Sequence, residues 1–112
     1  MSQLGIDVLA VWESGGTPGR LEVKAAVKAS LAELVEAAPG HSVEIRVPPF
    51  AAVQAIDGAR HRRGTPPAVV ECDARTWLEL ATGRLDWADA VGDGRVRASG
   101  ERSDLSAYLP LR

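Results

Sequence analysis

A helical spacing of apolar residues marks the segment from residue 23 to residue 38. Its apolar residues recur every three or four positions and share one helix face: Val23, Val27, Leu31, Leu34, Val35 and Ala38. Lys24, Lys28 and Glu36 lie away from that face, as charged residues do on a surface helix. Pro39 and Gly40 follow directly, and this pair stops a helix.

The apolar residues of segment 4–12 fit two patterns. Leu4, Val8 and Val11 fall at helical spacing, whereas every second residue from Ile6 to Trp12 is apolar, as in a strand. A glycine-rich stretch then breaks the chain. A short helix is predicted for this segment, with a strand as the alternative.

Strand-like alternation begins at Ser42. Val43, Ile45 and Val47 alternate with charged residues, which predicts a half-buried strand over 43–47. Two further strands are expected after it, over residues 50–56 and 68–72. Neighbouring strands of this kind suggest an antiparallel meander.

Short helices and one more strand are expected in the last third of the chain. Asp73 and Asp86 are suitable N-cap residues, and they predict helices over 73–81 and 86–91. A strand over 95–99 follows a Gly-Asp-Gly turn. Ser103 is expected to cap a final helix that carries Leu105, Tyr108 and Leu109.

Length and composition limit the class of protein. A chain of 112 residues fits one core, so we expect an N-terminal helix or variable segment over 1–20 and one domain over 21–112. A net charge of −2 argues against nucleic acid as a partner. The chain has one cysteine, so no internal disulfide can form, and no apolar run reaches membrane-spanning length. A cytoplasmic protein without stable membrane insertion is the simplest interpretation.

Three segments in the last third form a recognisable pattern: DARTWLELATG over 73–83, LDWADAV over 85–91 and GRVRASG over 94–100. This pattern resembles the sterol carrier protein-2 family. Three further segments are similar to a short bacterial branch of that family: RVPPFAAVQ over 46–54, RGTPP over 63–67 and TWLEL over 76–80. The resemblance covers residues 21–111. It implies an α+β fold in which a mainly antiparallel sheet of four to five strands is covered by helices that enclose an apolar tunnel.

Catalytic chemistry has little support in the sequence. A single cysteine and two histidines make a zinc site improbable, and we expect neither a metal nor a cofactor. Cys72 lacks a Cys-x-x-Cys partner and is expected to be a buried, unreactive thiol. His41 is expected at a solvated strand edge. These observations predict a protein that is not an enzyme.

The predicted function is binding of a lipid or another apolar small molecule. Its expected lining is a set of large apolar residues: Trp77, Leu78, Leu80, Leu85, Trp87, Val91, Leu105 and Leu109. Arg62 and Arg63, in a basic loop, are expected to meet a charged head group. The alternative is a protein-interaction or regulatory module, with a homodimer as one form, whose core is filled and takes no ligand. A weaker third hypothesis is a domain that accompanies an enzyme.

Overall fold

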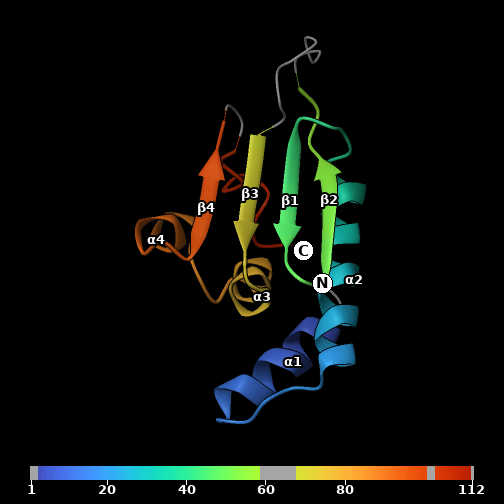
Figure 1. Ribbon diagram of the computed structural model, residues 1–112, viewed down its shortest axis with the longest axis vertical. Helices are drawn as coiled ribbons and strands as arrows, with labels where there is room; N and C mark the ends of the chain where they lie inside the picture. The colour runs from blue at the N-terminus through green and yellow to red at the C-terminus, as the bar shows by residue number, and fades with distance from the viewer. Residues whose placement is uncertain (1–2, 59–67, 101–102, 112) are drawn as a thin grey trace.

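A computed structural model describes residues 3–58, 68–100 and 103–111. Within these residues the chain forms an α+β fold of four helices and four strands (Figure 1). In chain order they are α1 (Gln3–Glu13), α2 (Arg20–Ala37), β1 (Val43–Val47), β2 (Ala51–Ala55), β3 (Ala68–Cys72), α3 (Ala74–Thr82), α4 (Trp87–Gly92) and β4 (Val96–Ser99). The predicted ends of the helices α3 and α4 and of the strands differ from these by one residue at most.

The four described strands form one mixed sheet in the order β2-β1-β3-β4. β1 pairs antiparallel with β2, and β3 pairs antiparallel with β4, but β1 and β3 run parallel, with Val43 opposite Ala68. The expected meander is therefore wrong, because β1 lies between β2 and β3 (Figure 1). The apolar side chains of β1 are fully buried, whereas β2 is largely alanine and lies at the edge.

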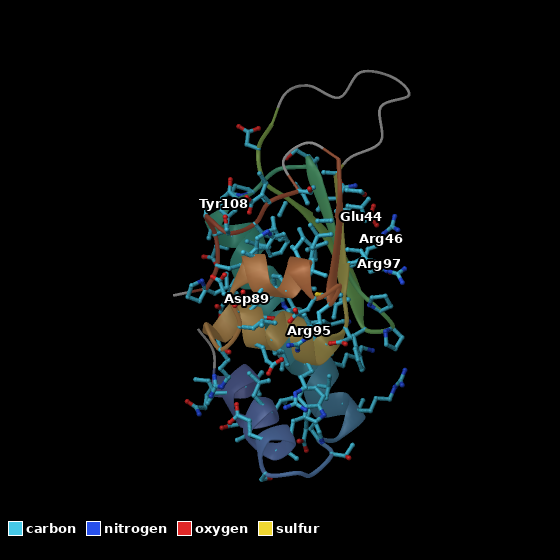
Figure 2. The ribbon with its side chains drawn as sticks, turned by 90° about the vertical axis from the view of Figure 1, so that its left-hand side faces the viewer. Glu44, Arg46, Asp89, Arg95, Arg97 and Tyr108 are labelled. Atoms are coloured by element: carbon cyan, nitrogen blue, oxygen red, sulfur yellow. The ribbon has the colours of Figure 1, made fainter. Side chains whose placement is uncertain are left out.

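One face of the sheet is covered by helices and the other is open (Figure 2). Ile45, Val70 and Val96 belong to the covered face and are at most 3% exposed. Figure 2 shows Glu44, Arg46 and Arg97 on the opposite side, turned away from the helices. The period-two pattern of charged and apolar residues thus separates the two faces, as expected for a one-sided sheet.

The N-terminal segment is a helix, which settles the choice between helix and strand there. Val8 and Leu9 of α1 are 3% and 0% exposed, and α1 packs on α2 and α3. At its end, Glu13 accepts a hydrogen bond of 2.8 Å from Arg84 Nε. α1 is therefore part of the same core as the sheet.

The predicted final helix is absent from the described part of the C-terminal segment. Residues 106–108 form a turn instead. The carboxylate of Asp104 accepts a hydrogen bond of 2.9 Å from the backbone N–H of Ser106. Such a local side-chain bond gives the backbone an alternative to helix.

Candidate functional site

A groove lies between the α3–α4 corner and the C-terminal segment. Its volume is about 180 Å³, and its lining is mainly apolar: Leu80, Gly83, Leu85, Asp86, Trp87, Ser106, Leu109 and Pro110. Leu80 and Trp87 are buried, Leu85 and Leu109 are half-buried, and Asp86 and Ser106 lie exposed at the rim. Figure 2 shows Asp89 of α4 and Tyr108 of the C-terminal segment on the helix side of the sheet.

The first wall of the groove is the turn that joins α3 to α4. Asp73 Oδ1 accepts a hydrogen bond of 2.7 Å from the backbone N–H of Thr76, which confirms the predicted cap of α3. Gly83 ends α3 in the left-handed region, with φ 82°, a conformation that glycine adopts without steric cost. The N–H groups of Arg84 and Leu85 then bond the carbonyl of Glu79, at 2.9 and 3.2 Å, so the corner has a fixed shape.

The second wall is the C-terminal segment, which is held at both ends. Leu105 is fully buried, and the N–H of Leu111 donates to the carbonyl of Ala81 at 2.9 Å. Pro110 approaches Gly83 closely, since a Cβ added at Gly83 would lie 3.4 Å from Pro110 Cγ. The groove is therefore a space between two anchored walls.

The polar turn of this wall has one perturbed carboxyl. The backbone N–H of Ser106, and then its hydroxyl, hold the pKa of Asp104 below its ordinary value. The turn that carries Ser106 to the groove is therefore built around a carboxylate.

Two larger hollows lie at the Pro48 end of the open sheet face, and charged residues are the majority of the lining in the first of them only. One, of about 300 Å³, is lined by Pro48, Glu71, Cys72, Asp73, Gly94, Arg95 and Arg97. The other, of about 330 Å³, is lined by Glu44, Arg46, Pro48, Pro49, Phe50, Ala51 and Ala52. The groove is lined by three leucines and a tryptophan with one charged residue, so we take it as the candidate site for an apolar ligand.

Comparison with known proteins identifies the family. The sequence pattern of a family described as bacterial SCP orthologs matches residues 19–111. The chain belongs to this family. A search of curated proteins finds no match. The matched segment contains every residue of the groove, whereas α1 precedes it.

Four of the predicted lining residues meet at the groove in this member of the family: Leu80, Leu85, Trp87 and Leu109. Trp77, Leu78 and Leu105 lie elsewhere, in the core, with side chains 0% exposed. Val91 is 40% exposed and is not part of the groove lining. Arg62 and Arg63 lie outside the described residues.

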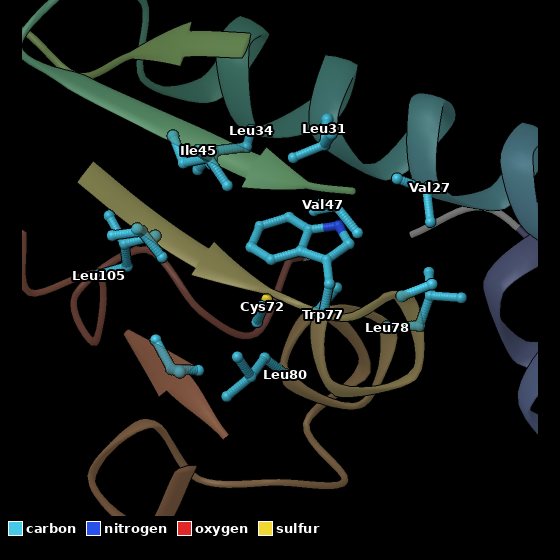
Figure 3. Packing of buried hydrophobic residues seen from close by; sticks show 14 of the residues in the cluster. Val27, Leu31, Leu34, Ile45, Val47, Cys72, Trp77, Leu78, Leu80 and Leu105 are labelled. Atoms are coloured by element: carbon cyan, nitrogen blue, oxygen red, sulfur yellow. The ribbon is translucent and has the colours of Figure 1, made fainter. Parts of the chain in front are cut away.

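The packing of Trp77 shows why part of the predicted lining belongs to the core instead. Its indole ring packs among residues of α2, β1 and α3, close to Val27, Leu31 and Val47 (Figure 3). The indole N–H donates to Ser30 Oγ at 2.8 Å, so the polar atom of this buried ring is satisfied. Space that a tunnel would need at this place is occupied by the protein itself.

Two residues considered for catalytic chemistry, Cys72 and His41, are not part of the groove lining. Burial, and then the nearby Asp73 carboxylate, raise the pKa of the Cys72 thiol to about 12, so this sulfur is protonated at neutral pH. His41 is exposed, and its Nδ1 lies 2.9 Å from Gln54 Oε1 in a hydrogen bond. Among the described residues, no group of three His, Cys, Asp or Glu side chains is placed to hold a metal ion.

The rim contains residues that the sequence analysis missed as site residues. Asp86 was expected as a cap, but its side chain accepts no hydrogen bond from α4. Ser106 and Pro110 reach the groove because the C-terminal segment turns where a helix was expected. No local pattern distinguishes these positions. In the part of the chain described here, no helix is both long and apolar enough to cross a membrane.

Proposed function

We propose that the groove binds an apolar small molecule, or the apolar part of an amphiphile, without making or breaking a covalent bond. The observation that carries this proposal is the convergence of Leu80, Leu85, Trp87 and Leu109, from three different parts of the chain, around one space. Ligand sites are concave and mainly apolar, with a few polar groups that orient the ligand. Membership in a bacterial SCP family supports the same class of function.

The size of the groove limits what it can hold. Its volume of about 180 Å³ is below the range of roughly 300–1,000 Å³ that is usual for drug-sized ligands. At about 30 Å³ per water-sized group, it has room for about six such groups. The proposed occupant is thus a short alkyl chain, a ring, or the end of a longer chain whose remainder lies outside.

The test uses the indole N–H signals of the tryptophans in a ¹H–¹⁵N spectrum. Titration with 1-hexanol should shift the signal of Trp87, which lines the groove, and leave that of Trp77, which is fully buried and bonded to Ser30. Assignment comes from Trp87→Phe. The titration extends to millimolar ligand, because about six atoms contribute little binding energy.

A matched pair of variants makes this test specific. Ser106→Trp places a large side chain in the groove from an exposed position and should abolish the Trp87 shift. Ala107→Trp adds the same side chain at the next exposed position, outside the lining, and should leave the shift intact. If neither 1-hexanol nor any larger apolar ligand shifts Trp87, the groove is not the site. The alternative of an interaction module then takes its place, with sedimentation against protein concentration as its test.

A further inference from the structure

The one charged side chain in the described lining of the groove is negative. The described lining contains one carboxylate, Asp86, and no Lys, Arg or His. The other polar side chain at the rim is the hydroxyl of Ser106, which carries no charge. An exposed carboxylate is negative at neutral pH. A ligand that presents its own carboxylate at this rim would therefore meet a like charge.

The carboxylate of Asp86 has no structural task within the described part of the chain. Its backbone has the extended conformation of an N-cap, with φ −80° and ψ 142°, yet its side chain accepts no bond from the helix. It makes no ion pair or hydrogen bond with another described residue. Its oxygens are therefore open to a ligand from the groove.

The nearest cation along the chain is already paired. Arg84 belongs to the corner but not to the groove lining, and its Nε donates to Glu13 Oε1 of α1 at 2.8 Å. One turn further along α4, Asp89 is exposed and adds a second negative charge on the same side of the corner. Among the residues that the structure describes, the unpaired charged side chains at this end of α4, Asp86 and Asp89, are thus negative.

We propose that the groove selects an organic cation, namely a small apolar molecule with a protonated amine, and this rests on the proposed function. The apolar part lies against Leu80, Trp87 and Leu109. The ammonium group donates a charge-assisted hydrogen bond to Asp86 at the rim. Ser106 offers a hydroxyl as a second acceptor. The ligand is set in place by one charge and one apolar contact surface.

The experiment compares three probes of nearly equal size with the full-length protein: hexylamine, 1-hexanol and hexanoate. Each is titrated at neutral pH while the indole signal of Trp87 is followed. Hexylamine should bind most tightly and hexanoate most weakly, with about a fivefold difference between them, because a solvent-exposed ion pair contributes modestly. Raising the salt concentration to about 0.5 M should reduce this difference.

Asp86→Asn tests the residue itself, with Asp89→Asn as the control of equal charge change outside the lining. Asp86→Asn should bring the three dissociation constants together, within about twofold, while Asp89→Asn should preserve their order. Asp86→Asn should keep the wild-type melting temperature, because its side chain forms no cap bond. Asp89→Asn should lower it only slightly, because a carboxylate in the first turn of a helix stabilises that helix modestly.

The outcomes separate this proposal from the proposed function. If no probe shifts Trp87, the proposed function fails and the selectivity for amines fails with it. If the probes bind with equal affinity, or hexanoate binds most tightly, the groove binds apolar ligands but the selectivity for an amine is wrong. If Asp89→Asn changes the three dissociation constants as much as Asp86→Asn does, the preference comes from the overall negative charge of this region. The specific role of Asp86 is then wrong.

Discussion

Asp73 and Asp86 both precede a short helix with an extended backbone, but their carboxylates do different things. Asp73 bonds the N–H of Thr76, whereas Asp86 bonds no backbone group of α4. The difference follows from burial. Thr76 is 0% exposed, so its N–H needs a partner from the protein, whereas Asp89, the equivalent residue of α4, is exposed and water can serve its N–H. The same residue type at the same helix position is structural in one helix and available to a ligand in the other.

The largest expected effect is a loss of stability on removing Trp77 of α3, which is more deeply buried than Trp87 of α4. Trp77→Ala should lower the free energy of unfolding by about 3–5 kcal/mol, because it removes a fully buried ring and leaves a cavity. Trp87→Ala should cost less, since Trp87 faces the groove on one side. Chemical denaturation measures both, and Trp77→Phe serves if the alanine variant does not fold. Equal losses at the two positions would contradict the contrast between the helices.

Local signals were enough to predict these elements: apolar periodicity for α2 and β1, strand propensity for β3, and an aspartate at the N-cap for the two short helices. Strand order was not predictable in this way, because the parallel pairing of Val43 with Ala68 joins segments on either side of β2. The C-terminal turn is held by bonds from Ser106 to Asp104 and from the N–H of Tyr108 to the carbonyl of Leu105, although the apolar spacing fits a helix. Four apolar residues of the groove belonged to the predicted lining, but Asp86 had the same local signature as Asp73. Whether such an aspartate caps its helix depends on the burial of the first helical turn, which the local sequence does not show.

A smaller effect is expected at the corner that separates the two helices. Gly83→Ala should cost about 1–2 kcal/mol of stability, because an L-residue is strained at φ 82°. Gly92→Ala is the matched control, since Gly92 has no positive φ and nothing lies within 4 Å of an added Cβ. Thermal denaturation of both variants measures the difference. If both variants melt at the same temperature, the corner does not require glycine at position 83.

The smallest expected effect tests the two aspartates directly. Asp73→Ala should lower stability by about 1 kcal/mol, and Asp73→Asn by less, because an amide oxygen can still accept the bond from Thr76. Asp86→Ala should leave the unfolding midpoint unchanged, because its side chain forms no cap bond. Denaturant titration of the three variants provides the measurement. A loss at Asp86 as large as that at Asp73 would assign it a structural role after all.

The ion pair between Glu13 and Arg84 means that α1, which lies outside the matched segment, changes the charge near the groove. Residues 19–111 match the family, and within that stretch alone Arg84 would count as a cation beside the rim. With α1 included, the same guanidinium is half of an ion pair with a residue outside the matched segment. A ligand preference observed in a relative without this helix therefore does not transfer to this protein, even where every groove residue is identical.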